Sequence, residues 1–226
     1  GGLDGSVMKI MKLEPSQRVK DRWLCHLEDG SILRVTENEV VSFALYSGMD
    51  LSPERLEELQ RTAGESRARG KALDLIARKP VSRKELVKKL TAKPPRKKDG
   101  TEREPIATQE QAETVADWLE DLGYLNDREY AKTVVRHYSA KGYGDRKLRD
   151  ELFRRGVPRE LWTEVLEEAQ EPEDGIDTFL QKRFRGGTPD QKDLKRAADA
   201  LARRGYNWNE IREGLNRYGA GIEEEL

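Results

Sequence analysis

The apolar positions from residue 125 to residue 166 recur with the period of α-helices, and glycine or proline interrupts them at short intervals. Asn126 is a suitable N-cap for the first helix, because its side chain can accept a backbone N–H that has no partner in the first turn. Gly142 and Gly156 would end the first and second helices, and Pro158 would begin the third. The apolar stripes are Tyr130, Val134 and Tyr138 in the first helix, Leu148, Leu152 and Phe153 in the second, and Leu161, Trp162, Val165 and Leu166 in the third. Three helices this short bury too little alone, so neighbouring segments must complete the core.

Similar helix signals flank this stretch on both sides. Residues 82–85 and 108–111 each form a capping box, in which the first and fourth residues satisfy each other's backbone N–H groups. Residues 54–76 carry the apolar pattern of one long helix, or of two in series with Gly64 and Gly70 as weak points. Further helix starts are expected at Ser52-Pro53, at Thr188-Pro189 with Gln191 three residues after the cap, and at Asn207. The chain is therefore predicted to be helical from about residue 52 onward.

The helical part is also self-similar. With Gly156 and Gly205 aligned, RRGVPRELWTEVL matches RRGYNWNEIREGL, and Trp162 corresponds to Ile211. Self-similarity at roughly 50 residues indicates three-helix modules stacked in series, each completing its core against its neighbours. We predict an elongated, curved array with an extended surface for a partner.

The N-terminal residues follow a different, two-residue period that is typical of strands. Trp23, Cys25 and Leu27 alternate with Leu24, His26 and Glu28, and Leu33 and Val35 resume the alternation after an Asp29-Gly30-Ser31 turn. A three-residue turn at that place predicts that Leu27 pairs with Leu33 and Cys25 with Val35. Residues 7–13 are expected to form another strand, and residues 40–45 fit either a strand or a helix. A small antiparallel sheet that leans on the following helix is the expected result.

These patterns together predict a mainly α fold: three tandem three-helix repeats, which resemble helix-turn-helix units, preceded by a small N-terminal antiparallel β-sheet. The predicted domains are residues 1–48 for the β region, 49–123 for the first repeat, 124–171 for the second and 172–226 for the third. Within the first repeat, the polar and proline-containing stretch 93–105 is expected to be a disordered loop. Residues 171–175, which are acidic and contain proline and glycine, are expected to form a hinge.

Composition and charge narrow the classes of function. Of the 226 residues, 38% are charged and 35% are hydrophobic, which suits small helical modules better than one large sheet-based core. The 42 basic and 43 acidic residues nearly cancel, so a uniformly basic nucleic-acid-binding protein is not indicated. We see no signal peptide and no apolar run long enough to span a membrane, and we expect a cytoplasmic protein.

The residue types that carry catalysis or bind metal are sparse. The single cysteine, Cys25, lies on the apolar face of a predicted strand and is expected to be a packed core thiol. His26 and His137 are the only histidines, too few for a metal cluster. The Gly142-x-Gly144 pair lacks the third glycine and the preceding strand of a dinucleotide site, and no phosphate-binding P-loop motif occurs. We therefore expect no catalytic residues, no metal and no cofactor.

Three segments of the chain resemble the RecX family. They are ALDLIARKPVSRKELVKKL at residues 72–90, LEDLGYLNDREYAK at 119–132 and KGYGDRKLRDELFRRGV at 141–157, and the resemblance extends over about residues 72–218. The most specific parts are Gly-Tyr-Leu-Asn-Asp at 123–127 and Lys-Gly-Tyr-Gly at 141–144. Two departures are evident: the basic loop 93–105 replaces a short connection, and Asn126 stands where the family usually has Asp.

The resemblance implies an array of three three-helix repeats and a non-enzymatic function. RecX proteins regulate the RecA recombinase, generally by inhibiting it, and are pictured in the helical groove of the RecA filament on single-stranded DNA. The implied function is control of homologous recombination, DNA repair and the SOS response, by a monomer that binds the RecA nucleoprotein filament. A weak direct contact with DNA is expected beside the RecA filament. The alternative function is direct binding of single- or double-stranded DNA through a basic face of the repeats.

Both hypotheses need a basic surface, and the charges of the second repeat supply a candidate. Arg-Arg-Gly recurs at equivalent places in two repeats, which favours a surface shared between them. The candidate partner-binding residues are Lys141, Tyr143, Arg146, Arg149, Arg154, Arg155, Arg203 and Arg204. The competing interpretation is a solvated helix face with internal ion pairs, in which Tyr143 makes a hydrophobic contact at a helix C-terminus.

Overall fold

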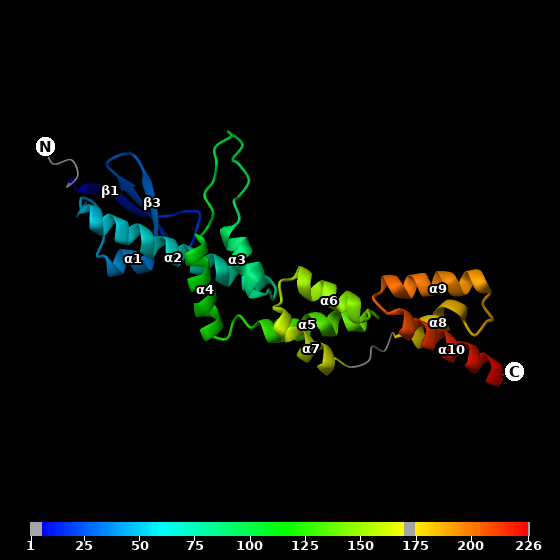
Figure 1. Ribbon diagram of the computed structural model, residues 1–226. Coiled ribbons are helices and arrows are strands. Elements are labelled where there is room, and N and C mark those ends of the chain that lie inside the picture. The colour runs from blue at the N-terminus through cyan, green and yellow to red at the C-terminus, as the bar shows by residue number, and fades with distance from the viewer. Residues whose placement is uncertain (1–5, 170–174, 226) are drawn as a thin grey trace. The chain divides into compact units, whose positions relative to one another are not determined.

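The protein is described by a computed structural model, in which residues 6–169 and 175–225 are defined (Figure 1). The prediction of a mainly helical fold with a small N-terminal antiparallel sheet is confirmed. The chain forms two compact units, one of residues 1–79 and 86–124 and one of residues 80–85 and 125–226. The predicted boundaries between repeats stay a prediction, and the expected hinge falls largely on residues 170–174, outside the described part of the chain.

The sheet of the first unit has four antiparallel strands in the order β3-β2-β1-β4. Their bounds are Met8–Pro15 for β1, Arg22–Leu27 for β2, Ile32–Thr36 for β3 and Asp50–Leu51 for β4. The predicted hairpin register is wrong by two residues, because Cys25 pairs with Leu33 and Trp23 with Val35. The turn begins one residue earlier than expected, with Gly30 at φ +88°. A shift of two residues keeps the same side chains on the same face, so Cys25, Leu27 and Val35 are still buried.

The helix α1 (Glu37–Ser42) follows β3 directly, so the ambiguous segment 40–45 is partly helical. Its Glu39 is buried, and its carboxylate accepts hydrogen bonds from the backbone and hydroxyl of Thr36 and from the hydroxyl of Ser66. The next helix, α2 (Pro53–Arg78), is a single continuous helix with Ser52 as its N-cap. Its buried residues Leu59 and Ala63 complete the core of the sheet.

The capping boxes that begin the next two helices are confirmed. In α3 (Arg83–Thr91), the Ser82 hydroxyl accepts the Glu85 N–H at 3.1 Å, and the Glu85 carboxylate accepts the Ser82 N–H at 3.1 Å. In α4 (Gln109–Asp121), Thr108 and Gln111 do the same. Residues 93–105 are not structureless: they form a turn held by a Lys97 N–H to Thr101 carbonyl bond, with exposed ion pairs to Glu102.

In the second unit, the helices α5 (Asp127–Ala140), α6 (Asp145–Arg154) and α7 (Trp162–Glu168) enclose one core. A short 3₁₀ turn, η2 (Arg159–Leu161), precedes α7. Asn126 caps α5 as predicted, and Gly142 and Gly156 end α5 and α6 with φ of +84° and +76°. Phe153 was expected to face inward, but 65% of its surface is exposed. In α6 the buried positions are Leu148, Glu151 and Leu152, so a charged residue occupies the place expected for an aromatic one.

A separate core lies among α8 (Ile176–Phe184), α9 (Gln191–Arg203) and α10 (Trp208–Glu225). The expected start of α9 at Thr188 is wrong by two residues, because Asp190 is the N-cap and forms a capping box with Asp193. Asn207 caps α10 as expected, since its side chain accepts the Glu210 N–H at 2.8 Å.

Candidate partner-binding surface

The eight candidate residues lie at three places in the second unit. Lys141 and Tyr143 follow the last residue of α5, Arg203 and Arg204 lie at the end of α9, and the other four lie on or directly after α6. Lys141, Arg146, Arg149, Arg154 and Arg203 are exposed, whereas Tyr143, Arg155 and Arg204 are half-buried. The structure therefore does not present them as one uniform set.

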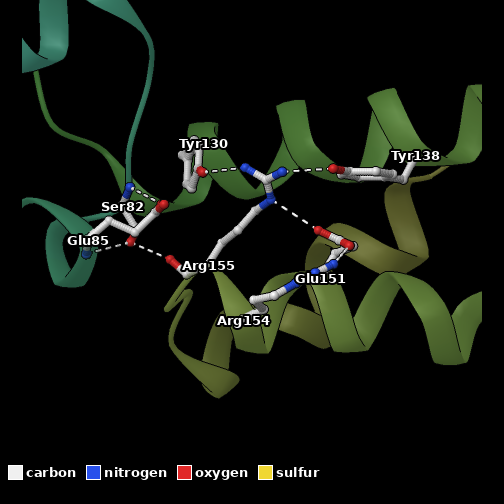
Figure 2. Close-up of polar contacts among 7 residues, drawn as sticks. All are labelled: Ser82, Glu85, Tyr130, Tyr138, Glu151, Arg154 and Arg155. Carbon is white, nitrogen blue, oxygen red and sulfur yellow. Dashed lines mark hydrogen bonds and ion pairs between the residues drawn. The ribbon is translucent and has the colours of Figure 1, made fainter.

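Arg155 is held within the protein by several hydrogen bonds (Figure 2). Its guanidinium donates to the phenol oxygens of Tyr130 at 3.2 Å and Tyr138 at 2.7 Å, and to the carboxylate of Glu151 at 3.2 Å. Glu151 is only 3% exposed, so this arginine compensates a nearly buried negative charge. Burial by itself would lower the pKa of Arg155, but the hydrogen bonds to the two tyrosines outweigh it and raise that pKa. Arg155 is thus a structural residue of this unit.

The backbone of Arg155 has a further partner in the segment 80–85, which belongs to the same unit. The Ser82 hydroxyl donates to the Arg155 carbonyl oxygen at 2.5 Å, and the Asp127 carboxylate accepts the Arg83 N–H at 2.8 Å. A side chain at Gly156 would lie 2.8 Å from Cβ of Lys84. Ser82 therefore both caps α3 and anchors the start of that helix to the end of α6 (Figure 2).

The end of α9 receives the beginning of α6 in the same manner. The Gly144 N–H donates to the Arg204 carbonyl at 2.8 Å, and the Arg146 N–H donates to the Gly205 carbonyl at 3.1 Å. The Arg146 guanidinium adds a bond of 2.8 Å to the carbonyl of Ala202. Arg204-Gly205 thus corresponds to Arg155-Gly156, which explains the recurrence of Arg-Arg-Gly by packing between helices. The predicted shared surface is not required to explain that recurrence.

The Lys-Gly-Tyr-Gly segment at residues 141–144 is explained by the same contact. Gly142 adopts the left-handed conformation that ends α5. Gly144 has an ordinary backbone conformation, but a Cβ there would lie 2.8 Å from backbone atoms of Gly205 and Tyr206. Tyr143 stacks on Tyr138 with ring centroids 5.3 Å apart. Tyr206 is buried and donates to the Gly142 carbonyl at 2.9 Å, so both tyrosines have roles inside the protein.

One side of α6 carries several exposed charged side chains and one exposed aromatic side chain. Positions 146, 149, 150, 153 and 154 lie on one side of a helix with 3.6 residues per turn. Arg154 is 71% exposed and pairs with Glu151, and Arg149 pairs with Asp145. Phe153 lies among these charged side chains with most of its surface in solvent. The sequence missed this residue because its apolar character indicated burial.

A second basic group surrounds a cavity of about 380 Å³ beside Lys141 and Arg204. Its other lining residues are Phe179, Lys182 and Arg183 of α8, none of which the sequence had singled out. The guanidinium carbon of Arg204 lies 4.8 Å from the centroid of the Phe179 ring, and that of Arg183 lies 5.7 Å from it. A Lys-Arg pair next to an apolar stripe was the only available signal in the sequence, and such pairs occur throughout this chain.

The cysteine and His26, which were considered as possible reactive or metal-binding residues, are each explained by contacts within the protein. Cys25 is fully buried, and burial raises the pKa of its thiol to about 11. The His26 ring lies 3.0 Å from the Glu14 carboxylate, whose pKa is lowered by a hydrogen bond from Lys12 first and by His26 second. Within residues 6–169 and 175–225, no three His, Cys, Asp or Glu side chains are grouped so that they could hold a metal ion. Over the same ranges, no helix combines the length and hydropathy needed to cross a membrane.

Comparisons with known proteins place the chain in a family. Residues 126–166 match the family model described as "RecX, second three-helix domain". The regulatory protein RecX of Xanthomonas axonopodis pv. citri is 35% identical over 144 residues, which cover 63% of this chain and 82% of that protein. A RecX protein of Thermus thermophilus is 38% identical over 141 residues, which cover 62% and 84% respectively.

Two solved structures have the same fold. A crystal structure of regulatory protein RecX is 20% identical, covers 92% of this chain and 99% of its own, and gives a TM-score of 0.62. The crystal structure of RecX from Lactobacillus salivarius is 18% identical, covers 70% and 97%, and gives a TM-score of 0.55. With the fold and the sequence in agreement, the chain belongs to the RecX family of regulatory proteins.

Proposed function

We propose that this protein regulates the RecA recombinase without catalysing a reaction itself, by binding the RecA–single-stranded DNA filament and inhibiting it. Through that inhibition it modulates homologous recombination and the SOS response. The family to which the chain belongs supports regulation, and the exposed face of α6 is the observation that supports binding. We propose further that the protein acts as a monomer and in the cytoplasm.

The α6 face has the composition of a binding site for a protein. Interfaces are enriched in aromatic residues and arginine, and a central aromatic side chain surrounded by polar groups often carries most of the binding energy. Phe153 would be that anchor, with Arg146, Arg149 and Arg154 around it. Asp150 lies on the same face, so complementarity requires a partner with mixed charge rather than bare phosphates. Arg155 is left out of the proposed surface because its half-buried guanidinium is engaged by Tyr130, Tyr138 and Glu151. Arg146 is kept because it is exposed, although its guanidinium also bonds the Ala202 carbonyl.

Direct DNA binding is the second candidate function, and one observation favours it. Among the residues that the structure describes, four cationic side chains and a phenylalanine line the cavity beside Lys141 and Arg204. A local basic site of this kind is compatible with a net charge near zero, because salt screens distant charges and a phosphate is attracted mainly by the cations next to it.

The test is RecA's single-stranded-DNA-dependent ATP hydrolysis, with this protein titrated at substoichiometric ratios. We expect inhibition well below one molecule per RecA, because a protein that occupies the filament groove or end affects many RecA subunits. Phe153→Ala should raise the concentration for half-inhibition by about tenfold or more, the loss expected for a hot-spot aromatic side chain.

The matched control is Val41→Ala in α1, which truncates an apolar side chain of similar exposure in the other unit. Both variants should melt as the wild type does. Full inhibition by Phe153→Ala would exclude the α6 face, and an absence of inhibition by the wild type would contradict the proposed function as a whole.

A further inference from the structure

We propose that the cavity lined by Lys141, Phe179, Lys182, Arg183 and Arg204 is a binding site for phosphodiester groups of a single nucleic-acid strand. We refer to these five residues as the α5–α8–α9 pocket. The inference deepens the second candidate function by naming its site, and it is tested without RecA, so that it can fail independently of the proposed regulation.

The pocket gathers positive charge from three separate helices. Lys141 is the C-cap of α5, Arg204 is the C-cap of α9, and Lys182 and Arg183 lie in the last turn of α8. These positions come from three segments that are far apart in sequence, so the tertiary structure creates the cluster. The C-terminal ends of helices carry partial negative charge, which favours cations at these positions even before a ligand binds.

Aromatic rings hold three of these cations in place. Lys141 Nζ lies 5.3 Å from the centroid of Tyr138, and the guanidinium groups of Arg183 and Arg204 lie over Phe179. A guanidinium stacked on a ring carries its N–H donors around its rim, where they remain available to acceptors beside the ring. Phe179 therefore orients the N–H donors of two guanidinium groups and leaves their positive charge in place. A carboxylate in the same position would neutralise that charge.

Lys141, Arg183 and Arg204 bring like charges to one pocket and therefore repel one another, and an anion relieves that repulsion. Phosphate matches the donors well, because guanidinium groups bind its oxygens in pairs and ammonium groups bind them as point charges. The arginines already cover the Phe179 ring, so a base cannot stack on it from their side. Recognition by backbone alone follows, and the site is expected to ignore base sequence.

The experiment measures binding of a fluorescein-labelled oligo(dT) strand by anisotropy over a series of salt concentrations. The test variant is K182A/R183A, and the matched control is K195A/R196A, an adjacent Lys-Arg pair on the exposed side of α9 outside the pocket. Both variants remove two positive charges from helices of the same core. We expect K182A/R183A to weaken binding at least tenfold and the control to change it less than twofold.

The salt dependence supplies a second readout. Each lost phosphate contact should reduce the slope of log K against log salt by roughly one, so K182A/R183A should lower it by one to two. Because Lys182 has another contact within the protein, the single variant Arg183→Ala is measured beside Arg196→Ala. The single variant should lower the slope by about one with unchanged melting.

Two competitors distinguish the source of the phosphate. An abasic strand of equal length should bind as tightly as oligo(dT), whereas ATP at the same total phosphate concentration should compete poorly. Equal effects of the pocket and control variants on affinity and slope would overturn the site. Competition by ATP as strong as by the strand would overturn the assignment to a strand.

Discussion

Arg154 and Arg155 are adjacent in the sequence but have different surroundings. Arg154 is 71% exposed and pairs with Glu151, whereas the side chain of Arg155 is 32% exposed and donates to two tyrosines and to that same, nearly buried glutamate. The sequence places them in neighbouring columns at the end of one helix, because adjacent residues lie about 100° apart around the helix axis. Reversing both charges at once would therefore mix an effect on binding with an effect on folding.

Arg155→Ala is expected to destabilise the protein by about 2 kcal/mol, because Glu151 would lose a charged hydrogen-bond partner while nearly buried. Arg154→Ala should cost less than about 1 kcal/mol, since Arg154 itself lies in solvent and Glu151 would keep its bond to Arg155. Urea unfolding followed by circular dichroism measures both. Equal losses of stability in the two variants would contradict the structural role assigned to Arg155.

Cys25 gives a prediction for the dependence of stability on pH. Its pKa is about 11 in the folded protein, above that of a thiol in an unfolded chain, which is about 8.5. Because the folded pKa is raised, the stabilisation is fully present below about pH 8.5 and is lost as the pH rises through 11. The whole contribution is roughly 3 kcal/mol.

The measurement is urea unfolding at pH 8, 10 and 11 for the wild type and for Cys25→Ala. The variant is less stable at pH 8 because it leaves a small cavity, but its stability should fall less between pH 8 and 11. Tyrosine and lysine titrations are common to both proteins and cancel in the difference. Rapid alkylation of the folded wild type at pH 8 would argue against a buried thiol.

At the scale of elements, contacts at the ends of helices determine how the helices of the second unit pack against one another. The Arg-Gly ends of α6 and α9 each accept a hydrogen bond from the segment that begins another helix, namely Ser82 in one case and Gly144 in the other. Glycine is needed twice over at position 205, since its φ is +99° and the backbone of Lys147 occupies the place of a side chain. The Gly142-Tyr143-Gly144 turn packs against this Arg204-Gly205 end of α9.

Gly205→Ala should therefore destabilise the second unit by more than about 3 kcal/mol, which combines backbone strain with steric overlap. Gly186→Ala is the matched control, because its φ is +79° and nothing lies within 4 Å of the added atom. The control should cost about 1 kcal/mol through strain alone. Thermal unfolding of the two variants measures the difference, and similar values would show that close helix packing is not what glycine provides at position 205.

At the scale of the whole molecule, the chain combines a unit built of a β-sheet and helices with a wholly helical unit. The first unit has a buried core under its sheet, and the second has one core among α5, α6 and α7 and another among α8, α9 and α10. A small, heavily charged chain can fold in this way because each core needs only short amphipathic helices and a few large apolar side chains. The two proposed binding features, the α6 face and the α5–α8–α9 pocket, both lie in the second unit. Regulation of RecA and contact with a strand are thus assigned to separate groups of side chains, and the two experiments can separate them.

The sequence by itself determined the local structure of this protein. Helix caps at Ser52, Ser82, Thr108 and Asn126, and helix-ending glycines at 142, 156 and 205, depend on contacts between residues three to six positions apart, so their patterns are visible in the chain. The apolar periods likewise determined the mainly helical class and the N-terminal sheet.

The tertiary structure alone decided which side chains meet. Packing between distant segments set the hairpin register, turned Phe153 toward solvent and placed Arg155 between Tyr130 and Tyr138. It also brought Lys182 and Arg183 to Lys141 and Arg204. These outcomes depend on complementary shape and on the pairing of buried charge across many residues, and no short stretch of sequence contains that information.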